Sequence, residues 1–182
     1  MAYKSVYRPK NKKKYIGKNI NNIITRSTWE KGLCKWLDRN TSVKSWSLES
    51  VIIPYFDQLY LKHRRYFMDF YIEMNTGQKL LVEVKPYNQT VPPKNYNKKY
   101  KEIQRLLTEN SNIILNSSVK KKYNSIITFA KNKDKWNTAR LYAKNNGFVF
   151  HIWTEYTLKK LGIKIITRTK PLKRIKRRSK KL

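Results

Sequence analysis

Two strand-like segments joined by a four-residue turn most constrain what this 182-residue chain can fold into. Residues 66–74 (YFMDFYIEM) alternate in character and are rich in aromatic side chains, and residues 79–85 (KLLVEVK) follow after the turn sequence NTGQ at 75–78. Alternation on both sides of a glycine-containing turn predicts an antiparallel β-hairpin. Pro86 cannot donate a ladder hydrogen bond, so it is expected to end the second strand.

Helical and strand-like patterns flank this hairpin. Ser27 can cap a helix that runs to about Asn40, because apolar residues recur there at helical spacing. Further elements are expected as a strand at 50–55, a helix after Pro92-Pro93 covering 96–107, helices at 119–131 and 134–146, a strand at 148–153, a short helix from Thr154 to Gly162 and an edge strand at 164–167. This order predicts an α/β fold with a mixed sheet and flanking helices, and it excludes a β-sandwich and a helical bundle.

Two of the eleven acidic residues occupy notable positions on the hairpin. Asp69 lies inside the first predicted strand, which is an unfavourable place for a carboxylate without a function. Glu83 and Lys85 are two residues apart on the second strand, so they point to one face of the sheet at a spacing of roughly 7 Å. The alternate residues of that strand point to the other, core-facing side: Leu80, Val82 and Val84. The hairpin is therefore expected to bring Asp69 beside Glu83 and Lys85.

Two carboxylates and one ammonium suit phosphodiester hydrolysis. Mg²⁺ prefers oxygen ligands and needs few from the protein. A bound metal ion lowers the pKa of its water and neutralises charge on a phosphate, and a nearby lysine can orient the attacking water. The alternative is a simple cross-strand ion pair, worth under about 1 kcal/mol if exposed.

Other candidate residues are less specific. Glu30 stands in an S-x-x-E pattern, so it can close a capping box, and it could also reach the metal from its helix. Glu49 could flank the site, whereas Glu73 is expected to be solvated near the turn. His63 and His151 have no ligand spacing and are expected to be ordinary surface and strand residues.

The net charge of +31 indicates a polyanionic partner, most simply nucleic acid. The ends 1–22 and 168–182 hold seven and nine Lys or Arg and no acid, which leaves +15 for residues 23–167. Solvated extensions are the alternative interpretation of both ends. Candidate phosphate contacts form a helix stripe and a tail cluster: Lys94, Lys98, Lys99, Lys101 and Arg105, and Lys173, Arg174, Lys176, Arg177 and Arg178. A charge run on a helix can also be only a solvated face.

Composition excludes several other classes. The single cysteine, Cys34, rules out a disulfide framework and a Cys-cluster zinc site. The apolar runs are too short for a membrane span, and no membrane partner is expected. No secretory signal pattern occurs at the N-terminus.

Four segments together resemble the PD-(D/E)XK nuclease superfamily: RSTWEKGLCKWLDRN, HRRYFMDFYIE, LLVEVKPYNQTVPP and KWNTARLYAKNNGFVFHIWTEYTL. Within it they are most similar to the head-completion nucleases of T-even-like contractile-tailed phages. That group is itself similar to the endonuclease subunit of a cut-and-paste bacterial transposon. The resemblance covers about residues 26–160, in the same order.

By this resemblance, Asp69 and Glu83 are the metal-binding pair, Lys85 is the catalytic lysine and Glu30 is the helix-borne glutamate. The proline that usually precedes the aspartate is replaced by Met68. The resemblance implies a restriction-endonuclease-like core, made of a central mixed sheet flanked by helices, and a cut in duplex DNA that depends on Mg²⁺ or Mn²⁺. It also implies action on the packaged genome end in the virion, with portal and neck proteins as partners, after synthesis in the host cytoplasm.

The expected organisation is a basic arm at 1–22, a nuclease-like domain at 23–167 and a basic tail at 168–182. A non-catalytic DNA-binding plug of the portal and neck region is the main alternative function. A ribosome-associated basic protein would fit the charge but would leave the acidic hairpin unexplained.

Overall fold

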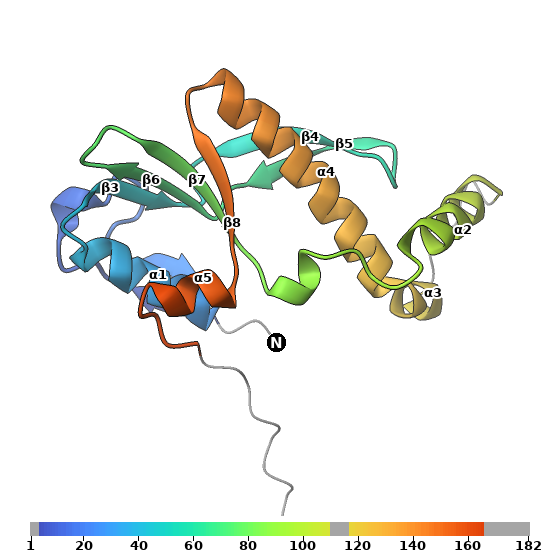
Figure 1. Cartoon of the computed structure of the whole chain (residues 1–182), viewed down its shortest axis with the longest axis horizontal. Coiled ribbons are helices and arrows are strands. Elements are labelled where there is room, and N and C mark those ends of the chain that lie inside the picture. The colour runs from blue at the N-terminus through green and yellow to red at the C-terminus, as the bar shows by residue number, and fades with distance from the viewer. Residues whose placement is uncertain (1–3, 110–116, 166–182) are drawn as a thin grey trace, which may run out of the picture.

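The computed structural model describes residues 4–109 and 117–165, and its centre is a four-stranded mixed sheet (Figure 1). In sheet order the strands are β3 (Val43–Leu48), β6 (Phe70–Met74), β7 (Lys79–Val84) and β8 (Val149–Trp153). β8 runs parallel to β7, whereas the other two pairs are antiparallel. The predicted α/β class is confirmed, and the arrangement is compatible with a restriction-endonuclease-like core.

Helices cover both faces of this sheet, so a hydrophobic core forms on each face. Helices α1 (Thr28–Arg39) and α5 (Glu155–Lys160) pack on one face, which includes the inward residues Leu80, Val82 and Val84 of β7 as predicted. Helix α4 (Asn124–Asn145) covers the opposite face, where Leu81 lies. Burial on both faces explains why β7 has a nearly continuous apolar sequence.

The predicted hairpin is confirmed as β6 and β7, with Phe70 opposite Val82 and Ile72 opposite Leu80. The prediction of one strand over 66–74 is wrong. The chain leaves β5 (Lys62–Phe67), passes through Met68 and Asp69, and enters β6. β5 pairs with β4 (Ile52–Asp57) in a separate two-stranded sheet, so the segment changes its partner at these two residues.

The segment between β3 and β4, which pairs with this break, bends at the same point. The Glu49 N–H donates to the Asp69 carbonyl at 3.1 Å, and the Met68 N–H donates to the Val51 carbonyl at 2.9 Å. Glu49 has a φ of +49°, a conformation that non-glycine residues rarely adopt. The strand predicted at 50–55 is β4, displaced by two residues, and β3 was not predicted at all.

The N-terminal residues that the structure describes belong to the fold, so the alternative of a solvated extension is wrong for residues 4–22. β1 (Ser5–Tyr7) pairs with β2 (Ile23–Thr25), and the 3₁₀ helix η1 (Lys12–Lys14) follows β1. Asp38, buried on α1, accepts hydrogen bonds from the Tyr7 hydroxyl (3.0 Å) and from the N–H groups of Lys10 (2.8 Å) and Asn11 (3.0 Å). A single buried carboxylate thus anchors this segment.

The helices differ from prediction in one main respect. α4 is one continuous helix of 22 residues, so the two helices predicted at 119–131 and 134–146 are wrong in their division. Asp134 does not cap a helix; its carboxylate accepts the Gln58 N–H at 3.0 Å from within α4. Gly147 follows the end of α4 with a φ of +70°, as its place in the sequence predicted.

The remaining elements are short or peripheral: η2 (Tyr87–Gln89), α2 (Tyr96–Glu109) and α3 (Ser117–Lys122). The edge strand predicted at 164–167 is not formed at Lys164 and Ile165, and the rest of it lies outside the described residues. Among the described helices, none is long and apolar enough to cross a membrane.

Candidate active site

The break between β5 and β6 places Asp69 against the end of β7. Asp69 Oδ2 accepts the backbone N–H of Val84 at 2.8 Å, so the carboxylate reaches across to the strand that carries Glu83. Lys85 directly follows β7, and its Nζ lies 2.9 Å from Glu83 Oε1. The structure therefore brings together Asp69, Glu83 and Lys85, as the hairpin predicted.

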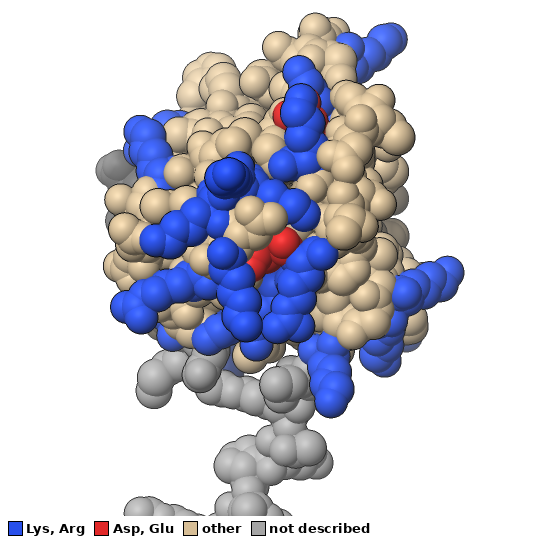
Figure 2. Space-filling model, turned by 90° about the vertical axis from the view of Figure 1, so that its left-hand side faces the viewer, with Lys and Arg blue, Asp and Glu red and all other residues tan. Residues whose placement is uncertain are grey.

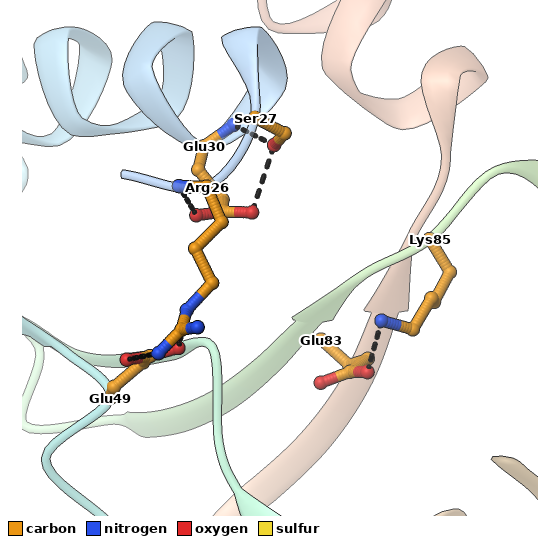
Figure 3. A network of polar contacts seen from close by, with 6 residues as sticks. All are labelled: Arg26, Ser27, Glu30, Glu49, Glu83 and Lys85. Carbon is orange, nitrogen blue, oxygen red and sulfur yellow. Dashed lines mark hydrogen bonds and ion pairs between the residues drawn. The ribbon is translucent and has the colours of Figure 1, made fainter. Parts of the chain in front are cut away.

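Glu83 is buried, with 1% of its surface exposed, and each carboxylate oxygen has one partner. Lys85 Nζ contacts Oε1 (Figure 3), and the Tyr66 hydroxyl donates to Oε2 at 2.7 Å. A buried carboxylate needs such partners because desolvation of an unpaired charge is very costly. Tyr66 was missed by sequence reasoning, although a tyrosine in a buried strand generally requires a partner for its hydroxyl.

The two carboxylates of the site repel each other. Burial, followed by the negative charge of Glu83, raises the pKa of Asp69 well above its ordinary value, and Lys85 offsets only part of this. Burial alone would lower the pKa of Lys85, but the charges of Glu83 and Asp69 outweigh it and raise that pKa. Lys85 is therefore held as an ammonium, and two neighbouring carboxylates compete for stabilising positive charge.

Asp69 and Glu83 are the described residues best placed to hold a divalent cation. No group of three or more His, Cys, Asp or Glu side chains converges as a ligand set within residues 4–109 and 117–165. Mg²⁺ tolerates such a sparse set, because it usually keeps several waters and binds through one or two carboxylates together with substrate phosphate oxygens. The donor chemistry therefore fits Mg²⁺ or Mn²⁺.

Glu30 lies at the start of α1, where its capping role is confirmed. Its N–H donates to Ser27 Oγ at 3.1 Å, and its carboxylate accepts from Ser27 Oγ (2.9 Å) and from the Arg26 N–H (2.7 Å). Figure 3 shows this carboxylate directed to its own helix start, on a different element from Glu83 and Lys85. Its charge still acts on Asp69 and Lys85, but its side chain does not join their contacts.

The other acids and the histidines have defined places. Glu49 flanks the site through its backbone, while Arg26 holds its carboxylate with contacts of 2.7 and 3.0 Å (Figure 3). Glu73 lies near the turn with its side chain 18% exposed, and its carboxylate has two partners, Lys44 Nζ at 2.9 Å and the Ser45 hydroxyl at 3.0 Å. The side chains at positions 63 and 151 are exposed histidines, as predicted.

Exposed basic side chains occur on and just before α2 and on α4. The residues of the predicted helix stripe are all exposed: Lys94, Lys98, Lys99, Lys101 and Arg105. Lys94 lies before the start of α2, so its inclusion in a helix stripe is wrong. Lys98 lines a pocket of about 650 Å³ together with Lys133 and Arg140 of α4, and its lining also includes the aromatic residues Tyr96, Phe129 and Trp136. The predicted tail contacts lie outside the described residues: Lys173, Arg174, Lys176, Arg177 and Arg178.

A second gathering of positive charge covers the end of the molecule that carries β3 and the β6–β7 turn. Figure 2 shows Lys and Arg side chains spread over this face, with few acidic atoms among them. Exposed lysines of η1 and of α1 belong to this part of the chain, among them Lys12, Lys13 and Lys35.

Comparison with known proteins agrees with the predicted resemblance. Residues 40–155 match the family "TnsA-like endonuclease N terminal", a range that includes Asp69, Glu83 and Lys85 but not Glu30. The chain is 38% identical over 165 residues to the protein named "Head completion nuclease" of Enterobacteria phage T4, covering 90% of this chain and 99% of that protein. No solved structure matches the chain.

Proposed function

This chain belongs to the TnsA-like endonuclease family, and on that basis we propose that it hydrolyses the phosphodiester backbone of duplex DNA with a divalent metal ion held by Asp69 and Glu83. The observation that carries the proposal is the arrangement at the end of β7. There the buried carboxylate of Glu83 lies 2.9 Å from the Lys85 ammonium, and the carboxylate of Asp69, whose pKa is raised, lies beside them. The net charge of the protein is +31.

Each residue has a role that follows from its surroundings. Bound Mg²⁺ or Mn²⁺ supplies neutralisation of phosphate charge and a water of lowered pKa. Asp69 is poised to accept a cation, because one would relieve its repulsion from Glu83. The raised pKa of Lys85 favours an ammonium, so we assign it to donating hydrogen bonds to the attacking water or to a phosphate oxygen rather than to taking up a proton.

Duplex DNA is the proposed substrate because the chain carries a net charge of +31 and many of its basic side chains are exposed. The pocket lined by Lys98, Lys133 and Arg140 has no acidic residue in its lining. Together with the exposed basic residues of α2, this pocket can contact phosphates of a bound duplex. The tail 168–182 adds nine positive charges to this electrostatic attraction.

The biological role we propose follows the name of the phage T4 relative. The protein would act on the packaged genome end during head completion, before the tail is attached, with portal and neck proteins as its partners in the virion. We also propose Glu30 as an additional metal ligand. This role requires its carboxylate to leave the start of α1.

A non-catalytic DNA-binding plug is the second candidate function. It is favoured by the contacts of the acidic residues: Lys85 occupies one oxygen of Glu83, and Glu30 is engaged in capping α1. Acidic residues that are paired with other protein groups can serve the fold without hydrolysing a substrate.

Plasmid nicking separates the two functions. Purified protein is incubated with supercoiled plasmid and Mg²⁺ or Mn²⁺, and the variants Asp69→Ala and Lys85→Ala are compared with Glu73→Ala, an acid of the same hairpin that pairs away from the site with Lys44. We expect wild type and Glu73→Ala to nick and both site variants to lose nicking while keeping DNA binding. Equal nicking by all four proteins would refute the site, and a wild type that never cuts with any divalent ion would leave the plug.

A further inference from the structure

Helix α4 carries a lysine above the residues that hold Glu83. Ala139 and Ala143 let α4 approach the sheet closely, where they pack with Tyr55, Tyr66 and Leu81. Lys135 lies one helical turn before Ala139, so it projects over the same layer. Its Nζ is 5.2 Å from the centre of the Tyr66 ring and 6.0 Å from the centre of the Tyr55 ring.

The Lys135 ammonium has no ion-pair partner among the described residues. Lys85 forms an ion pair with Glu83, whereas Lys135 forms none with any carboxylate among residues 4–109 and 117–165. Its charge interacts with those of Glu83, Lys85 and Asp69, so it stands within the field of the acid pair. Partial burial lowers the pKa of Lys135, because no carboxylate lies close enough to compensate for the lost solvation.

A lysine over an aromatic ring often has no further role, because its stem covers apolar surface while its head reaches water. The same helix offers the comparison. Lys131 lies one turn earlier, and its Nζ is 4.9 Å from the centre of the Tyr60 ring. Its electrostatic neighbours are Asp57, Arg64 and other lysines, not the acid pair. The two lysines therefore make the same kind of contact in different surroundings.

We propose that Lys135 binds a DNA phosphate at the cut, either the one being hydrolysed or its neighbour, and so positions the strand against Asp69 and Glu83. This inference rests on the proposed function. Lys135 Nζ is held on helix α4 over the Tyr66 ring, within the electrostatic field of Glu83 and Asp69 and without an ion-pair partner among the described residues. Such an ammonium complements the charge of a phosphate that must approach two negative groups. Lys85 already contacts Glu83, so Lys135 is the second ammonium near the acid pair and the one without a carboxylate partner among the described residues.

Lys135→Met is compared with Lys131→Met in single-turnover cleavage and in the salt dependence of duplex binding. Lys135→Met is expected to slow cleavage at least about tenfold, because removal of one donor to the reacting group costs on the order of 100-fold or more in other enzymes. When the logarithm of the binding constant is plotted against the logarithm of the salt concentration, this variant should also reduce the slope by about 0.9, the contribution of one neutralised phosphate. Lys131→Met should leave both quantities near wild type, and Lys135→Arg should restore the slope.

Thermal unfolding of all three variants shows whether the fold is intact. Equal cleavage rates and equal salt slopes for Lys135→Met and Lys131→Met would overturn the inference. If the wild type cuts no DNA, the endonuclease proposal fails, yet the salt slopes still decide whether Lys135 binds a phosphate. A slope reduced by Lys135→Met alone would then support that binding, and matching slopes would reject it.

Discussion

The hydrogen bond between Tyr66 and Glu83 makes a quantitative prediction. Tyr66 is 2% exposed, and its hydroxyl donates to Glu83 Oε2 at 2.7 Å, while Lys85 serves the other oxygen. Tyr66→Phe keeps the ring under Lys135 and removes only the donor. One oxygen of a buried carboxylate is then left without a hydrogen-bond partner.

The expected cost follows from this hydrogen bond alone. Loss of a hydrogen bond to a buried charged group lowers the free energy of unfolding by about 2 kcal/mol. For a domain of this size the midpoint of thermal unfolding should then fall by about 4–8 °C. Cleavage should slow by about tenfold or more, as is usual when a partner that orients a metal ligand is removed.

Tyr55→Phe is the matched control. Tyr55 is 4% exposed and packs edge-on against Tyr66, with ring centres 6.5 Å apart. Its hydroxyl forms no hydrogen bond within the described part of the chain, so the variant should change stability by less than about 0.5 kcal/mol. Unfolding is followed by circular dichroism and cleavage by plasmid nicking. Indistinguishable midpoints for the two variants would refute the assigned role of the Tyr66 hydroxyl.

Three further predictions concern other parts of the chain. Asp38→Ala removes the acceptor of three hydrogen bonds and should lower the free energy of unfolding by on the order of 3 kcal/mol. Amide hydrogen exchange should accelerate over residues 5–15, and unchanged protection there would contradict the anchoring role. Because the pKa of Asp69 is raised in the folded state, the metal-free protein should lose stability as the pH rises from about 4 toward that raised value. Asp69→Asn should therefore be more stable than wild type at neutral pH in chelator, and parallel stability curves between pH 4 and 8 would exclude this origin. Deletion of residues 168–182 should lower the salt slope of DNA binding by about 0.9 for each phosphate that the tail neutralises, and an unchanged slope would assign the tail to another partner.

Local sequence patterns were sufficient for the elements whose signals are contained within a few residues. The alternation within residues 66–74 and 79–85 and the turn between them predicted the β6–β7 hairpin, including the inward face of Leu80, Val82 and Val84. Ser27 predicted the start of α1 through its side-chain hydrogen bond, and Gly147 predicted the end of α4. Each of these depends on backbone periodicity or on an interaction within one turn of chain.

Only the tertiary structure decided where each strand finds its partner. Residues 66–74 carry one uninterrupted strand pattern, but β5 pairs with β4 and β6 pairs with β3 and β7, so the chain breaks at Met68 and Asp69. That break directs the Asp69 carboxylate to β7, and the packing of α4 brings Lys135 over Tyr66. Side-chain alternation specifies which face a residue occupies, whereas hydrogen bonding between distant strands specifies its neighbours, and this second kind of information is not present in any local pattern.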